Sequence, residues 1–174
     1  MSQWRRHSDS PTHVAAFFDH KDFQDRTVWL WEELAKHYKD NPCVHYITFI
    51  YRMLRTSSSS SSSSWYSAIA GYNPLNEPTD PSHTRLITVY DRLHSAIRKH
   101  DTRHIIYWDG NTFASDFSHF GDAWKRWTNS AYSIHDYSVF GFPAAPSLYT
   151  GSKEQKARLR QSFERKMAWM KENG

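Results

Sequence analysis

The chain has 174 residues and a formal net charge of +4, so it is long enough for one domain with a hydrophobic core. Its 8 Trp, 10 Tyr and 10 Phe favour a globular fold over a disordered chain, and such side chains also suit stacking on sugars or bases. The single cysteine, Cys43, excludes an intrachain disulfide, and no apolar stretch is long enough to span a membrane.

The distribution of charge limits the classes of partner. The basic residues are scattered, and the densest basic run, Lys156 to Lys166, contains an acidic residue, as a solvated helix face does. We therefore expect no nucleic-acid partner, no membrane and no obligate protein partner. The first residues, MSQWRRHSDSP, lack the apolar stretch of a signal peptide. Because the N-terminus is also expected to be truncated, the compartment stays open.

The first expected helix runs from Asp22 to Pro42. Asp22 or Asp25 is expected to cap its start. Asn41 and Pro42 are expected to end it, because the residue before a proline is pushed out of the helical region. Its apolar residues recur at steps of three and four along the chain: Val28, Trp31, Leu34, Ala35 and Tyr38.

A strand and a second helix come next. The pattern predicts a short buried strand from Ile69 to Leu75 and a helix from Asp80 to Asp101. Asp80 is the expected N-cap, and Pro81 occupies the first turn, where a helix tolerates proline best. The apolar stripe of this helix is Leu86, Tyr90, Leu93 and Ile97.

Two more buried strands are expected, from Arg103 to Asn111 and from Ala131 to Ser138. A last helix is expected to begin at Ser152, which forms a capping box with Gln155. The stripe of that helix is Leu159, Phe163, Met167 and Met170. Apolar strands that alternate with amphipathic helices predict an α/β fold with a parallel sheet, either a doubly wound open sheet or a barrel. No glycine-rich turn follows a strand, so nucleotide binding is not favoured.

The segment from Cys43 to Ala68 does not fit this pattern. Connections from a helix to a strand usually take about two to six residues, whereas this segment is far longer and contains an unbroken serine run from Ser57 to Ser64. We expect it to be an insertion outside the evolved fold, with a disordered serine run. It is either a retained, in-frame intron or a genuine surface loop.

An Asn-Glu pair lies at the expected end of the first strand. Pro74 and Pro78 flank Asn76 and Glu77, and proline ends a sheet ladder because it cannot donate a hydrogen bond. In a barrel, side chains at the carboxyl ends of strands face the active site. A carboxylate there can act as a general acid, and an asparagine can orient a sugar, which suits glycoside hydrolysis. The tripeptide Asn-Glu-Pro is also common in loops that cap helices.

Four segments together resemble glycoside hydrolase family 5, the cellulase family: WLWEELAKHYKDNP, IAGYNPLNEP, HIIYWDGNTF and YSIHDYSVFGFP. The resemblance covers most of the chain except residues 43–68. It implies a partial (β/α)8 TIM barrel, roughly strands three or four to six with their helices. Residues 1–174 would then be a fragment of one glycoside hydrolase barrel domain.

The resemblance also implies a site. Glu77 is implied as the acid/base and Asn76 as its substrate-orienting neighbour, while His135 and Tyr137 match the histidine and tyrosine of the sixth strand. His7 matches a histidine near the third strand less closely. The implied reaction is retaining hydrolysis of a β-linked glucan or related glycan. The resemblance implies that the nucleophile is a glutamate on the seventh strand. That strand is expected to be absent, so this chain alone is expected to be inactive.

Other candidates have more ordinary interpretations. The spacing of His7, His13, His20 and His135 fits no zinc motif, and no metal or cofactor is expected. Asp109 either ends a strand and caps a turn or serves as a second acid. Trp108, at a strand end, is a candidate for stacking on a sugar, whereas Trp124 and Trp127 are expected in the core. The alternative function is a non-catalytic barrel fragment with at most weak glycan binding.

Overall fold

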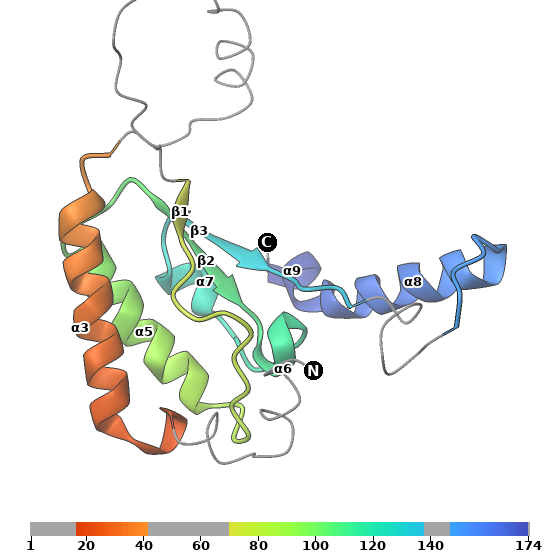
Figure 1. Cartoon of the computed structure of the whole chain (residues 1–174), viewed down its shortest axis with the longest axis horizontal. Helices are drawn as coiled ribbons and strands as arrows, with labels where there is room; N and C mark the ends of the chain where they lie inside the picture. Colours follow the sequence, from red (N-terminus) through yellow and green to blue (C-terminus); the bar gives the residue numbers. More distant parts are fainter. Residues whose placement is uncertain (1–16, 42–69, 138–146, 174) are drawn as a thin grey trace, which may run out of the picture.

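A computed structural model describes residues 17–41, 70–137 and 147–173 of the chain (Figure 1). His7 and the segment from Cys43 to Ala68 lie outside the described residues. The main elements alternate as the sequence predicts: α3 (Lys21–Tyr38), β1 (Gly71–Tyr72), α5 (Arg85–Arg98), β2 (Ile105–Asp109), β3 (Ser130–Ser133) and α8 (Lys153–Lys166). Three shorter helices complete the description: α6 (Asn111–Ala114), α7 (Ala123–Arg126) and α9 (Ala168–Asn173).

The described strands form one parallel sheet in the order β1-β2-β3. Gly71 is paired with Ile105, and Ile106 with Ser130, so each strand lies beside the next one along the chain. Position 71 has no room for a residue with a side chain, because a Cβ atom there would lie 2.1 Å from the carbonyl oxygen of Ile105. Neighbouring strands in chain order are the arrangement of a barrel wall.

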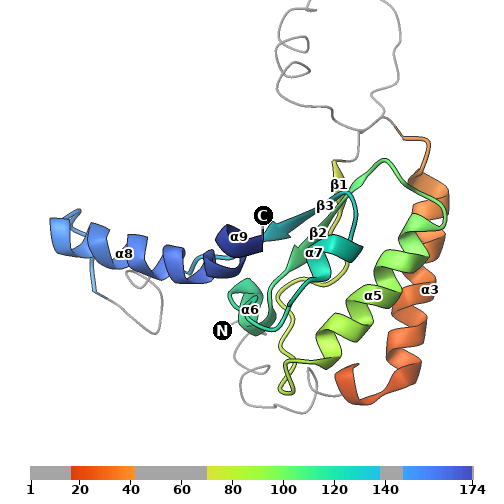
Figure 2. The ribbon, with the colours of Figure 1, turned by 180° about the vertical axis from the view of Figure 1, so that it is seen from behind.

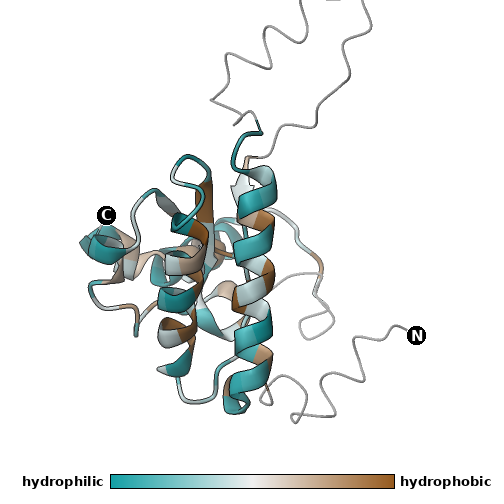
Figure 3. Cartoon of the chain, turned by 90° about the vertical axis from the view of Figure 1, so that its left-hand side faces the viewer, coloured by the Kyte–Doolittle hydropathy of each residue, from teal (hydrophilic) through white to brown (hydrophobic). Residues whose placement is uncertain are grey.

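Helices α5 and α3 cover one side of this sheet, side by side (Figures 1 and 2). Hydrophobic and hydrophilic residues alternate along both helices (Figure 3), as amphipathic helices require. Burial of Leu86, Leu93 and Ile97 on α5 contributes about 1.5–3 kcal/mol for each side chain. The apolar stripe predicted for this helix is confirmed.

An aromatic cluster fills the space between the sheet and the shorter helices. The rings of Tyr90 and Trp108 lie 4.5 Å apart, and those of Trp108 and Trp127 lie 5.1 Å apart. Tyr132 and Trp169 meet at 4.7 Å, which anchors α9 to β3. These tilted and edge contacts add to the free energy gained by burying the rings.

Two predicted helix caps are wrong. The residue before α3 is His20, and Asp25 pairs with Arg92 and Lys21 instead of capping the helix. Helix α5 begins at Arg85, not at Asp80. Asp80 still serves that helix from a turn outside it, because its Oδ2 accepts a hydrogen bond from the backbone N–H of Leu86 at 3.0 Å.

The last helix differs most from its prediction. The cap is confirmed, since Ser152 Oγ accepts a hydrogen bond from the backbone N–H of Gln155 at 3.2 Å. The predicted apolar stripe is not buried on α8, where no residue is buried and Phe163 is exposed. Figures 1 and 2 show the reason, because α8 extends away from the sheet. Within the described residues, no helix has the length and apolar character to cross a membrane.

Candidate active site

The site is organised by a buried carboxylate at the carboxyl end of β2. The side chain of Asp109 is fully buried. Its Oδ1 accepts a hydrogen bond from Asn73 Nδ2 at 2.9 Å, and its Oδ2 accepts one from the backbone N–H of Glu77 at 2.9 Å. The carbonyl oxygen of Asp109 accepts a third bond, from the Tyr90 hydroxyl. Asp109 therefore ties the loop after β1 to the end of β2.

Glu77 adopts a backbone conformation that a residue with a side chain rarely adopts. Its φ of +50° lies in the left-handed region, which costs free energy for any residue except glycine. The bond from its N–H to Asp109 holds the residue in that conformation. The Glu77 side chain is 8% exposed, so its carboxylate has little contact with solvent.

His135 and Tyr137 reach the Glu77 carboxylate from beyond the end of β3. His135 Nδ1 lies 2.7 Å from Glu77 Oε1, and the Tyr137 hydroxyl donates a hydrogen bond to the same oxygen. The other ring nitrogen of His135, Nε2, lies 3.4 Å from Asp109 Oδ2. The backbone N–H of His135 donates to the carbonyl of Ala114 at 3.1 Å, which fixes the strand extension.

The structure thus brings together three of the predicted site residues, Glu77, His135 and Tyr137, at the carboxyl ends of parallel strands. Asn76 precedes Glu77 in the same loop and is exposed. Its position leaves its side chain accessible to a ligand, while the predicted role in orienting a sugar stays a prediction.

Trp108 does not join this site. Its side chain is fully buried among core aromatic rings, and its Nε1 donates a hydrogen bond to Ser130 Oγ at 2.9 Å. This position contradicts the prediction that Trp108 stacks on a sugar, because alternate residues of a strand face opposite sides of the sheet. Trp124, which was expected in the core, is exposed instead, while Trp127 is buried as predicted.

Two residues that the geometry makes important carry only weak signals in the sequence. The pattern leaves Asp109 as either a turn residue or a second acid, and it does not single out Asn73. The available signal was a carboxylate that directly ends an apolar strand, since a buried charge requires several hydrogen-bond donors. Burial raises the pKa of the neighbouring Tyr90 well above its usual value, as does the charge of Asp109. The Tyr90 hydroxyl therefore stays protonated and donates.

One group of described residues outside the Glu77 cluster could hold a metal ion. It consists of His83, Asp116 and His119, on the loops that follow β1 and α6. Among the described residues, Glu77, His135 and Asp109 do not form such a group.

Comparisons with known proteins place these features in a family. The family model described as Cellulase (glycosyl hydrolase family 5) matches residues 63–174. A protein of Phanerodontia chrysosporium named beta-xylosidase is 59% identical over 168 residues. That match covers 97% of this chain and 30% of the relative, so the chain spans less than a third of the curated relative it matches.

Two solved structures share the fold. One is a hyperthermophilic endo-beta-1,4-glucanase in complex with substrate, with a TM-score of 0.60 and 18% identity. The other is an endoglucanase, with a TM-score of 0.59 and 17% identity. Each match covers 92% of this chain and 48% of the solved chain. The likeness confirms a partial α/β barrel and removes the doubly wound alternative.

Proposed function

This chain belongs to glycosyl hydrolase family 5, and we propose on that premise that Glu77 is the general acid/base of a retaining glycoside hydrolase. One observation carries the proposal. The carboxylate of Glu77 lies at the carboxyl ends of parallel strands, within 2.7 Å of His135 Nδ1 and in a hydrogen bond with Tyr137. In barrels of this class, catalytic groups come from that end of several strands.

The contacts of Glu77 assign different tasks to its two oxygens. The side chains of His135 and Tyr137 both contact Oε1 of Glu77. We therefore assign the transferable proton to Oε2. In the first step a nucleophilic carboxylate attacks the anomeric carbon and the bond to the glycosidic oxygen breaks, while Oε2 gives its proton to that oxygen, so that the leaving group departs as an alcohol. In the second step the Glu77 carboxylate takes a proton from the water that hydrolyses the glycosyl-enzyme.

The proposed substrate contacts come from the exposed rim of the same cluster. Asn76 is exposed beside Glu77, and Tyr137 is 41% exposed. We assign Asn76 to a sugar hydroxyl and His135 with Tyr137 to the sugar site and the orientation of Glu77. His7 remains a proposed substrate-binding residue outside the described part of the chain.

Asp109 cannot supply the second carboxylate of the reaction. It has no exposed surface, and both of its oxygens accept hydrogen bonds from the loop after β1. Because a retaining mechanism needs a nucleophile in addition to the acid/base, we propose that the 174-residue chain alone hydrolyses no glycoside. The complementary carboxylate would come from another part of the barrel.

The proposed substrate is a β-linked glucan or a related glycan. The name of the Phanerodontia chrysosporium relative adds β-xylosides to the compounds worth testing. Residues 1–174 would form part of one barrel domain, with residues 43–68 as an insertion that does not belong to it. Sequencing mature messenger RNA decides whether that insertion is a retained intron: transcripts that all keep its codons make it a genuine loop.

A chimera tests the role of Glu77. In it, the 174-residue chain replaces the matching segment of the Phanerodontia chrysosporium relative, which is 59% identical to it. The chimera is assayed with aryl β-glucosides and aryl β-xylosides. Glu77→Gln is expected to lower kcat by about 10²- to 10⁴-fold, the usual contribution of general acid–base catalysis. The loss should be smallest for a dinitrophenyl leaving group, which needs no protonation, and added azide should restore turnover of that substrate.

A matched control removes a carboxylate elsewhere. Glu164→Gln, on the exposed face of α8, should leave kcat and KM of the chimera unchanged. Wild-type turnover by the Glu77→Gln chimera would exclude Glu77 as the acid/base. In a separate assay, turnover by the isolated 174-residue chain that Glu77→Gln abolishes would overturn the proposed inactivity. Glycan binding by the chain without turnover in the chimera would favour the alternative, a non-catalytic binding fragment.

A further inference from the structure

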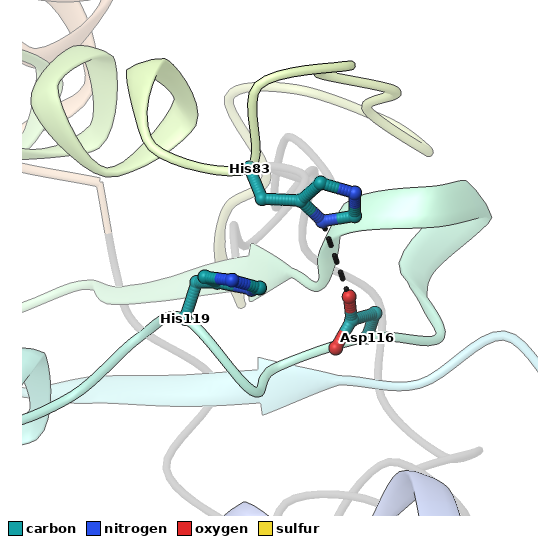
Figure 4. A group of neighbouring side chains, drawn as sticks. All are labelled: His83, Asp116 and His119. Carbon is teal, nitrogen blue, oxygen red and sulfur yellow. Dashed lines mark ion pairs between the residues drawn. The ribbon is translucent and has the colours of Figure 1, made fainter.

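Three potential metal ligands converge on the loops beside the Glu77 cluster. His83 lies in the turn before α5, while Asp116 and His119 lie in the segment between α6 and α7 (Figure 4). One donor atom from each residue lies within 4.8 Å of the other two. The rings of His83 and His119 approach each other at 4.9 Å between centroids. The residues come from two segments that are far apart in the sequence, so the fold creates the cluster.

The protonation of His83 can be inferred from its neighbour Asn111. Asn111 Oδ1 accepts a hydrogen bond from the backbone N–H of Asp80 at 2.7 Å, and Asn111 Nδ2 donates to the carbonyl of Asp80 at 2.9 Å. These two bonds fix the orientation of the amide, so Nδ2 is the atom that lies 3.0 Å from His83 Nδ1. Because an amide nitrogen only donates, His83 Nδ1 must present its lone pair.

Asp116 presents a second electron pair to the same place. Its Oδ1 accepts hydrogen bonds from the Ser118 backbone at 2.9 Å and from the Ser118 hydroxyl at 2.7 Å. Its Oδ2 faces His83 Nδ1 at 3.4 Å. An aspartate that accepts these two bonds is ionised at neutral pH, as an ordinary carboxyl group is.

Two electron-pair donors that face each other without a hydrogen between them are expected to attract a cation. We propose that His83, Asp116 and His119 bind one divalent transition-metal ion of the zinc class, with the fourth position open to water. Zinc takes imidazole nitrogen and carboxylate oxygen at about 2.0–2.2 Å, which places neighbouring ligands of a tetrahedral site about 3.3 Å apart. The separation of His83 Nδ1 and Asp116 Oδ2, 3.4 Å, already matches that value.

The rest of the coordination requires small movements. The ring of His119 is exposed, and its Nδ1 lies 3.0 Å from the Ser118 hydroxyl, so the ring can turn toward the ion. The His83 ring would turn its Nδ1 from the Asn111 amide toward Asp116 and the ion, while Asn111 keeps both bonds to Asp80. His83 itself has a φ of +59°, and such strain is often kept where a side chain must point at a ligand.

The metal would join two loops that carry the candidate active site. The loop after β1 contains Glu77 and continues to His83, and the backbone N–H of Phe113 donates to the carbonyl of Pro78 at 3.3 Å. The segment with Asp116 and His119 follows α6, whose last residue, Ala114, accepts the backbone bond of His135. A bound ion would add a strong link between loops that two backbone hydrogen bonds already connect. We assign it a role in stabilising these loops and none in bond cleavage.

Zinc titration of the untagged 174-residue chain tests the site. Calorimetry with zinc chloride should show one ion bound per chain, and cobalt(II) should give the intense visible absorption of a tetrahedral site. His119→Ala and Asp116→Asn should each weaken zinc binding by more than about 100-fold, beyond the 10- to 100-fold that loss of an outer partner of a metal usually costs. His37→Ala removes an exposed histidine of α3 and should leave the affinity unchanged.

Stability provides an independent measurement. Because an ion that binds only the folded chain stabilises it, zinc should raise the melting temperature of the wild-type and His37→Ala chains but not that of His119→Ala. His119 is exposed, so its replacement should leave the far-ultraviolet circular dichroism unchanged. Equal zinc affinity in wild type and His119→Ala, or no zinc uptake by a folded wild-type chain, would overturn the proposal. Neither readout depends on glycosidase activity.

Discussion

The two ends of the sheet carry similar groups of side chains in different surroundings. At the amino end of β2, Asp101 accepts hydrogen bonds from the Tyr72 hydroxyl at 2.6 Å and from His104 Nδ1 at 2.5 Å. At the carboxyl end, Glu77 accepts from the side chains of His135 and Tyr137. Each end thus combines one carboxylate, one histidine and one tyrosine.

Exposure separates the two groups. The side chains of Asp101 and His104 are both 0% exposed, whereas His135 is 30% exposed. Solvent can reach the carboxyl-end group through His135 but not the amino-end pair of Asp101 and His104. Residue types alone therefore do not identify chemistry in a barrel, because the same types are buried at one end and accessible at the other.

The largest expected effect on stability concerns the amino end. Asp101→Ala would leave the Tyr72 hydroxyl and the backbone N–H groups of Arg103 and His104 without their acceptor. The free energy of unfolding should fall by about 3–5 kcal/mol, the range for breaking a buried polar cluster. Urea denaturation of the 174-residue chain measures this. Asp122→Ala, at an exposed aspartate, is the control and should cost far less; equal losses in the two variants would contradict the structural role of the amino-end group.

The corresponding change at the carboxyl end should affect stability much less. Glu77→Gln keeps the shape of the side chain and a carbonyl oxygen that can accept from Tyr137 and His135. We expect the free energy of unfolding to change by about 1 kcal/mol or less, although the same substitution should nearly abolish turnover in the chimera. Urea denaturation again measures it. A loss as large as that of Asp101→Ala would mean that Glu77 is a structural residue and would remove the distinction between the two ends.

The sequence was sufficient for the elements whose own pattern decides their structure. The pattern predicts the stripe of α5 and the apolar run of β2 because local periodicity and burial agree there. Glu77, His135 and Tyr137 were linked by resemblance, not by spacing, since nothing local shows that residues 58 positions apart, such as Glu77 and His135, will touch. The start of α5 was missed because Asp80 caps it from a turn that includes Ser82.

Trp108 and α8 show what a local pattern leaves out. Trp108 lies at a strand end beside Asp109, and only the register of the strand decides that Trp108 faces α5 and the core. The stripe on α8 is amphipathic, but its burial depends on a partner surface, and the described part of the chain supplies none to Phe163. Both errors concern tertiary context, which can override a one-dimensional pattern.

The smallest expected effect separates a buried carboxylate from a surface one. On α3, Glu32 accepts hydrogen bonds from Lys99 at 2.8 Å and from His100 at 3.0 Å. These bonds lower the pKa of Glu32 from 4.5 to about 2, and the bond from Lys99 has the larger effect. The pKa of Asp101 is also lowered: its burial acts in the opposite direction, but the bonds from Tyr72, His104 and Arg103 outweigh it.

The pKa of Glu32 and that of Asp101 are both lower in the folded chain than in the unfolded chain, so each ionised carboxylate stabilises the fold. This contribution is complete above the pKa of the unfolded chain. It is lost as the pH falls through the pKa of the folded chain. We expect the free energy of unfolding to fall between pH 5 and about pH 2, with a smaller slope in Glu32→Gln and in Asp101→Asn.

Salt distinguishes the contribution of Glu32 from that of Asp101, because 1 M sodium chloride reduces the Debye length to about 3 Å and screens exposed charges more than buried ones. High salt should remove most of the difference between wild type and Glu32→Gln while leaving that of Asp101→Asn, since the ammonium of Lys99 is exposed, whereas Tyr72 and His104, which donate to Asp101, are buried. If salt removed both differences equally, Asp101 would be accessible to solvent, and the contrast in exposure between the two ends of the sheet would fail.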